Sequence, residues 1–156
     1  MIKFYIPGYT NDKPKRASYR FRALIPLQGM RPGDGVISNV QQSVAGDIVI
    51  LAKKSKPEDL EYLKQHNIKT VYDICDNKWR KYVSKSWADK IIIPHNFLCR
   101  ESDLITTTCL NMKYLIQKET GKDSIVINDP YEAVKKEPNV DFNKPIINIF
   151  TFGNSK

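Results

Sequence analysis

Short apolar stretches recur along the first 130 residues, and amphipathic segments separate them. A continuous apolar run at 47–52 is typical of a strand buried on both faces of a sheet. A turn rich in glycine and proline, 29–35, leads into a shorter apolar stretch at 36–38. The pattern predicts further strands, in chain order, at 3–6, 69–74, 103–107 and 124–127.

The amphipathic segments predict helices. One covers 19–25, and Pro26 limits its extent because a proline inside a helix removes a backbone hydrogen bond. A second covers 57–66 and begins with a proline and two acidic residues, which suit the positive end of a helix dipole. A third covers 110–119 and is stopped by Gly121.

The alternation of strands and helices predicts an α/β fold. Strands that are apolar on both faces favour a Rossmann-like, mainly parallel sheet flanked by helices. We assign this domain to residues 1–131. In such sheets ligands bind outside the carboxyl ends of the strands, so residues that follow a strand are the candidates for a site.

The residues after 131 break this alternation. Residues 132–144 are polar and contain prolines, as in a linker. A new apolar strand at 146–152 runs into Gly153 and Asn154, which indicates that a second domain begins within 145–156. We expect this trailing strand to belong to a truncated C-terminal domain whose remainder is missing.

The chain is basic, with a net charge of +8 from 25 Lys and Arg against 17 Asp and Glu. This balance favours anionic partners, such as phosphorylated small molecules, nucleic acid or a membrane surface contacted peripherally. The densest basic segments, 13–16 and 53–56, are not interleaved with aromatic residues. That pattern favours a solvated lysine surface and argues against nucleic-acid binding.

Other composition features exclude several classes of protein. The three cysteines have no metal-ligand spacing, so free thiols are expected. His66 and His95 lie far apart in the sequence, and no metal site is predicted. No apolar run approaches the roughly 18 residues that a membrane helix needs, and the amino terminus does not resemble a signal peptide. These features predict a cytoplasmic protein.

Two carboxylates, Asp73 and Asp76, stand at the carboxyl end of the predicted strand 69–74, and Trp79 follows them. Carboxylates at a strand end could act as a base, accept hydrogen bonds from sugar hydroxyls or hold a cation. They could equally cap a turn and form structural hydrogen bonds. The residues alone leave both interpretations open.

Three basic or titratable side chains are further candidates. Arg20 and Arg22 lie on the helix after the first strand, where planar guanidinium groups suit a phosphate or a carboxylate. Surface ion pairs are the alternative role for both. His95 follows the run 91–94 and could face the crevice as an acid, a base or a hydrogen-bond donor, or could be structural.

Taken in order, several segments resemble the amino-terminal, acceptor-binding half of retaining group-1 glycosyltransferases of the GT-B fold. Each segment alone is weakly specific, and their order along nearly the whole chain carries the resemblance. The segments are 17–26, 71–77 with Trp79, 102–108, 126–130 and 152–155.

The resemblance implies two Rossmann-like domains that face each other across a cleft. It implies transfer of a sugar from a nucleotide-sugar donor to a glycosyl acceptor with retained configuration, without a metal or other cofactor. The implied site residues are Asp73, Asp76 and His95 as catalytic groups, Gly8, Tyr9, Arg20, Arg22 and Trp79 on the acceptor, and Asp129, Gly153 and Asn154 on the donor side.

One departure from the family leaves a second function open. The family grips its donor with two glutamates eight positions apart, and no such pair occurs in this sequence. We therefore expect the chain alone to be inactive in sugar transfer. The alternative is a non-catalytic Rossmann-like module that binds an anionic or phosphorylated ligand. A weaker third hypothesis, nucleic-acid binding, predicts an affinity that falls steeply with salt.

Overall fold

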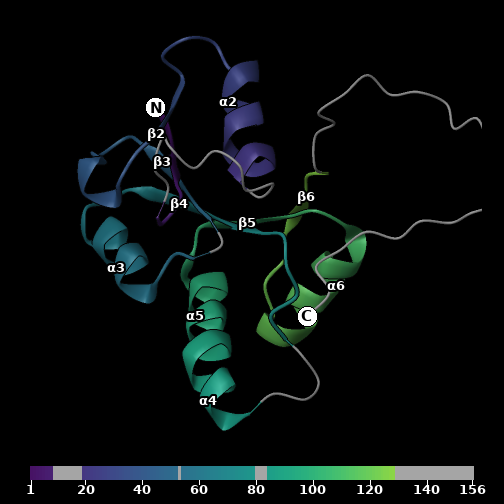
Figure 1. The fold of residues 1–156 in the computed structure, drawn as a ribbon. Coiled ribbons are helices and arrows are strands. Elements are labelled where there is room, and N and C mark those ends of the chain that lie inside the picture. Colours follow the sequence, from purple (N-terminus) through teal and green to yellow (C-terminus); the bar gives the residue numbers. More distant parts are fainter. Residues whose placement is uncertain (9–18, 53, 80–83, 129–156) are drawn as a thin grey trace, which may run out of the picture.

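Six strands form one sheet in which all neighbours are parallel, in the order β2-β1-β3-β4-β5-β6. The computed structural model describes residues 1–8, 19–52, 54–79 and 84–128 (Figure 1). The predicted α/β, Rossmann-like fold is confirmed. The strands are β1 (Ile2–Tyr5), β2 (Gly35–Ile37), β3 (Ile48–Leu51), β4 (Lys69–Ile74), β5 (Leu104–Thr107) and β6 (Ile125–Val126).

Helices connect the strands and lie on both faces of the sheet. Figure 1 shows α2 on one side of the sheet and α3, α5 and α6 on the other. The helical segments are η1 (Arg20–Leu24), α2 (Ile25–Gly29), η2 (Val40–Gln42), α3 (Pro57–Gln65), α4 (Lys85–Trp87), η3 (Ala88–Ile92), α5 (Ile93–Glu101) and α6 (Leu110–Thr120). Among the residues described, no helix is both long enough and apolar enough to span a membrane.

The larger hydrophobic core lies between the sheet and the helices α3, α5 and α6. Leu60 and Leu63 of α3 are fully buried there, as the amphipathic pattern of 57–66 predicts. Leu98 of α5 and Ile116 of α6 join them against the strands β3, β4 and β5. Burying a leucine or isoleucine side chain contributes about 1.5–3 kcal/mol, so this layer dominates the stability of the domain.

The opposite face of the sheet carries a smaller core beneath η1 and α2. Phe4, Ile6, Tyr19 and Ala23 form it. The prediction that strand 47–52 is buried on both faces is wrong in part, because Ile48 is 41% exposed. Within the described residues, the helices on this face are η1 and α2, which follow one another in the chain and pack against β1, so they cover only part of the sheet.

Pro26 does not end the first helix, contrary to the prediction. It stands in the first turn of α2, directly after η1. The preceding turn is a π-helix, η1, which closes wider hydrogen-bonded turns than an α-helix does. The helical segment therefore continues through the proline to Gly29.

The remaining predicted elements agree with the structure, with one omission. Gly121 ends α6 in the left-handed conformation at φ 74°, which glycine adopts without steric cost. The sequence pattern predicts no helix over 85–101, whereas α4, η3 and α5 form a continuous helical stretch there. The predicted linker 132–144 and trailing strand 146–152 lie outside the described residues.

Candidate functional site

The order of the strands defines where a ligand crevice belongs. After β1 the chain forms β2 on one side, and β3 then lies on the other side of β1. In doubly wound sheets this reversal opens a crevice at the carboxyl ends of the two central strands. Here those ends are Ile6 to Gly8 after β1, and Ala52 and Lys54 to Lys56 after β3.

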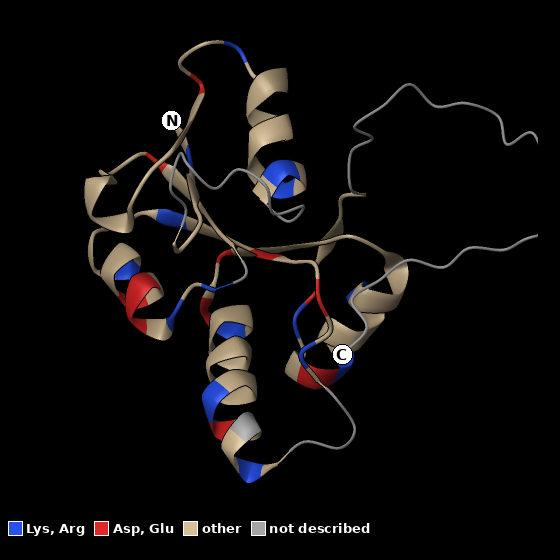
Figure 2. Ribbon diagram, viewed as in Figure 1, with Lys and Arg blue, Asp and Glu red and all other residues tan. Residues whose placement is uncertain are grey.

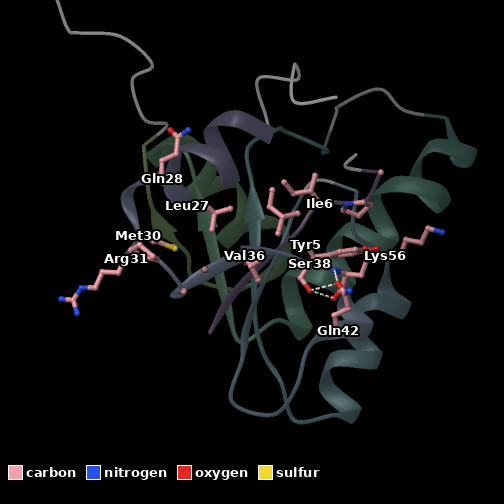
Figure 3. Close-up of a pocket in the computed structure, with 17 residues that line it drawn as sticks. Tyr5, Ile6, Leu27, Gln28, Met30, Arg31, Val36, Ser38, Gln42 and Lys56 are labelled. Atoms are coloured by element: carbon pink, nitrogen blue, oxygen red, sulfur yellow. Dashed lines mark hydrogen bonds between the residues drawn. The ribbon is translucent and has the colours of Figure 1, made fainter. Parts of the chain in front are cut away.

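A groove of about 940 Å³ opens beside β2 and reaches the carboxyl end of β1. Figure 3 shows Leu27, Met30 and Arg31 at one end of this groove, and Ser38, Gln42 and Lys56 at the other. We call it the β2 groove. Its volume lies within the range of small-molecule sites, which is about 300–1,000 Å³.

Several polar groups line the end of the β2 groove that lies at the carboxyl end of strand β2. The Gln42 side-chain oxygen Oε1 lies 3.2 Å from Ser38 Oγ and accepts a hydrogen bond of 3.1 Å from the Asn39 backbone N–H. Tyr5 donates its hydroxyl to Asp59 at 3.2 Å. Burial, and then the Asp59 charge, raise the pKa of Tyr5 to about 12, so the phenol stays protonated at neutral pH.

Gly8, a predicted acceptor-binding residue, lines the β2 groove where β1 ends. Its φ of +76° is in the left-handed region, which favours glycine over residues that carry a Cβ. The backbone therefore turns sharply at the crevice. Tyr9, its predicted partner on the acceptor, lies outside the described residues.

Gly35 keeps the opposite end of the β2 groove in shape. A Cβ at this position would lie 2.6 Å from Met30 Sδ and 2.8 Å from Leu27 Cδ2, both on the groove wall. We expect Gly35→Ala to displace these side chains and to lower the free energy of unfolding by about 1–3 kcal/mol, the usual cost of overpacking. Urea unfolding followed by circular dichroism measures the change.

Gly29→Ala is the matched control for this prediction. A Cβ at Gly29 meets no atom within 4 Å. Because alanine restricts the unfolded chain more than glycine does, this variant should be neutral or more stable by up to about 1 kcal/mol. Equal stability of the two variants would contradict the assigned role of Gly35.

A second pocket, of about 490 Å³, lies between the residues that follow β3 and the helix α5. Four lysines line it, Lys54, Lys56, Lys78 and Lys90, and the one acidic residue of its wall is Glu58. Lys and Arg, blue in Figure 2, occur on helices on both sides of the sheet. We call it the lysine pocket. Its apolar wall includes Tyr72 and Leu98 of the larger core.

His95, a predicted catalytic residue, borders the lysine pocket and is 4% exposed. Its Nδ1 lies 2.7 Å from the Tyr72 hydroxyl, and its ring centroid lies 4.5 Å from that of Trp79. Trp79 donates its indole N–H to Asn96 at 2.7 Å. Burial, and then the Lys78 charge, lower the pKa of His95 to about 4, so the imidazole is neutral at pH 7.

Asp73 and Arg22, predicted as a catalytic and an acceptor-binding residue, bind each other. Arg22 Nε donates to Asp73 Oδ2 at 2.6 Å, and a second guanidinium nitrogen pairs with Oδ1. Thr106 of β5 donates its hydroxyl to Asp73 Oδ1 at 2.7 Å. The Arg22 and Asp73 side chains are 8% and 5% exposed, so the pair ties η1 to the sheet in a nearly dry environment.

The other predicted site residues are spread along the carboxyl edge or beyond the described part of the chain. Asp76 follows β4, partly exposed, with Lys78 Nζ at 4.0 Å. Arg20 begins η1, and its guanidinium carbon lies 5.7 Å from the centre of the Phe21 ring. Asp129, Gly153 and Asn154 lie outside the described residues.

Sequence reasoning missed the lysine pocket. The composition of 53–56 predicts a solvated surface, whereas in the structure Lys54 and Lys56 follow β3 at the crevice. Lys78 and Lys90 could not be added without the fold, since they come from after β4 and from η3. Within the described residues, His, Cys, Asp and Glu nowhere gather in threes that could hold a metal ion.

The fold and these pockets define a Rossmann-like α/β domain in which two pockets reach the carboxyl edge of a parallel sheet. Comparison with protein-family models, with curated proteins and with solved structures finds no match to this chain.

Proposed function

We propose that this chain is the acceptor-binding half of a GT-B glycosyltransferase that takes a sugar from a nucleotide-sugar donor. The observation that carries the proposal is the six-stranded parallel sheet of order 2-1-3-4-5-6, with a small-molecule-sized groove that reaches its carboxyl edge. Gly8, Asp76 and Trp79, which the resemblance assigns to the site, all follow strands at that edge.

The proposal assigns binding and orientation to this half, and donor chemistry to a second domain. We assign Asp76 to binding the acceptor because its side chain is 42% exposed at this edge, whereas that of Asp73 is 5% exposed and binds Arg22 and Thr106. A carboxylate at this edge accepts hydrogen bonds from sugar hydroxyls and so orients the acceptor. His95 is neutral at pH 7 and sits beside Trp79, whose ring suits the apolar face of a sugar.

The native product of the whole reading frame tests this proposal. It is incubated with UDP-, GDP-, ADP- and dTDP-sugars and a panel of neutral and phosphorylated acceptors, and release of nucleoside diphosphate is measured. We expect acceptor-dependent release, reduced at least tenfold by Asp76→Asn. Asp123→Asn, at an exposed carboxylate that precedes β6, is the matched control and should retain the wild-type rate.

Two results would refute the proposal. No acceptor-dependent release with any donor would remove the glycosyltransferase function. Wild-type rates for Asp76→Asn would remove the assigned site even if transfer occurs.

A second function is favoured by the lysine pocket, in which four lysines face one glutamate. In this alternative the chain is a non-catalytic Rossmann-like module that binds an anionic ligand and needs no donor domain. It predicts ligand binding by the 156 residues alone, without any nucleoside diphosphate release by the native product.

A further inference from the structure

The lysine pocket gathers four positive charges, of which one, that of Lys78, lies 4.0 Å from a carboxylate oxygen of Asp76. With four lysines and one glutamate in its wall, the lining carries a net charge of +3. Among the described residues, Lys54, Lys56 and Lys90 form no ion pair within 4.0 Å. Like charges around one pocket repel each other, and an anion placed between them removes that repulsion.

The amino end of α3 does not provide the anion-binding groups here. Its first turn carries Glu58 and Asp59, and Asp59 already accepts the Lys56 backbone N–H at 2.7 Å. The helix end is therefore capped by its own carboxylate. The lysine side chains are the groups left to bind an anion.

A buried donor without a partner lies beside the same pocket. The single hydrogen bond between Tyr72 and His95 can form in two ways. If Nδ1 donates, the Tyr72 O–H and His95 Nε2 both lack partners. If the Tyr72 hydroxyl donates to Nδ1, only the Nε2–H of His95 lacks a partner. The second arrangement is favoured, because each unsatisfied buried polar group costs about 1–3 kcal/mol.

In that arrangement the Nε2–H of His95 is a hydrogen-bond donor with no acceptor among the described residues. A buried N–H donor, here on a His95 side chain that is more than nine-tenths buried, together with nearby lysines suits the binding of an oxyanion. The apolar wall of Ile91, Pro94 and Leu98 would contact the carbon part of the ligand.

We propose that the lysine pocket binds the phosphate or diphosphate group of a phosphorylated small molecule, through Lys54, Lys56, Lys78 and Lys90 and through the Nε2–H of His95. Lysines bind phosphate as point charges that need no fixed fork geometry, which suits four flexible side chains around one pocket. The inference goes beyond the proposed acceptor half, because it names the ligand chemistry and does not require transfer.

Titration of the 156-residue chain with pyrophosphate, by calorimetry in 100 mM salt, tests the site. We expect saturable one-to-one binding, and we expect Lys56→Gln/Lys90→Gln to raise the dissociation constant at least tenfold. Lys118→Gln/Lys122→Gln, which removes two lysines at the carboxyl end of α6, is the matched control and should change it less than twofold.

A second readout separates the pocket from general attraction to a basic protein. Bound pyrophosphate should shift the His95 Nε2 resonance in a nitrogen NMR spectrum, and His66, on the surface, should not respond. Absence of saturable binding up to 10 mM pyrophosphate would overturn the proposal, as would equal weakening by the two double variants.

The two proposals of function can fail separately. Sugar transfer by the native product with no pyrophosphate binding would refute the proposed anion site and support the proposed glycosyltransferase function. Pyrophosphate binding without sugar transfer would support the proposed anion site and refute the proposed glycosyltransferase function.

Discussion

Replacing Asp73 by Asn should lower the free energy of unfolding by about 3–5 kcal/mol. This is the usual cost of leaving one partner of a buried ion pair without its opposite charge. Arg22 would lose the carboxylate that it binds through two nitrogens, and Thr106 would lose its charged acceptor. Urea unfolding of the wild type and the variant, at equal pH and salt, measures the difference.

The double variant Arg22→Met/Asp73→Leu tests whether the pair itself causes this loss. Because it removes both charges, it should recover a large part of the stability that Asp73→Asn loses, since apolar replacements of buried ion pairs are often neutral. A double-mutant cycle over positions 22 and 73 gives the coupling energy directly. No coupling between the two positions would mean that the pair does not hold η1 on the sheet.

This prediction also separates structure from catalysis at Asp73. A residue that acts only on substrate can be replaced without unfolding the domain, and the resemblance assigns Asp73 such a role. If Asp73→Asn unfolds within 1 kcal/mol of the wild type, the structural role fails and the catalytic hypothesis gains weight. With the expected loss, a fall in activity of this variant would carry no information about chemistry.

The pairing of Arg22 with Asp73 shows what the sequence could and could not reveal. Alternation along β4 places Tyr72 and Ile74 in the larger core and therefore Asp73 on the other face. That much follows from the sequence. That Arg22 comes to the same face depends on where η1 packs, 51 positions away, and no local pattern encodes that distance.

The fold was predictable wherever local signals agreed. Strand β4 and helix α3 have apolar periodicity, and α3 and α6 also have a proline start and a glycine stop respectively. The helical stretch that contains α5 was missed because Pro94 and the run 91–93 interrupt its amphipathic pattern. In the structure, that proline occupies the first turn of α5, after a π-helical turn.

The candidate site was predictable as a set of residue types but not as an arrangement. Residues after strands were the right place to look, because parallel strands end at one edge of the sheet. His95 and Trp79 were proposed separately, and the structure brings their rings to 4.5 Å. The lysines of the pocket come from three parts of the chain, so only the fold brings them together.

His95 should make the stability of the domain depend on pH between about 4 and 6.5. Burial lowers its pKa in the folded protein from 6.5 to about 4. Between these values the unfolded chain binds a proton that the folded protein does not, so stability rises with pH. The contribution is complete above pH 6.5 and is lost as pH falls to 4.

The size of the effect follows from the shift in pKa. A shift of one unit corresponds to 1.36 kcal/mol, so lowering the pKa from 6.5 to about 4 gives a loss of roughly 3 kcal/mol. Its causes are the removal of the ring from water and the charge of Lys78. Trp79 and Tyr72 pack against the ring and help to exclude water, and neither carries a charge in this range of pH.

Two variants isolate the contribution of His95 from those of the carboxylates, which also titrate near pH 4. His95→Phe keeps an aromatic ring against Trp79 but cannot be protonated, so its stability should change less between pH 6.5 and 4 than that of the wild type, by roughly 3 kcal/mol. His66→Gln, at the surface, should follow the wild type. If His95→Phe and the wild type lose equal stability over this range, the buried imidazole is not the group that titrates.

The proposed anion site predicts a further result of the same experiment. A dianion bound near Nε2 stabilises the imidazolium, so saturating pyrophosphate should raise the folded-state pKa of His95 and reduce the pH dependence of the wild type, and it should leave that of His95→Phe unchanged.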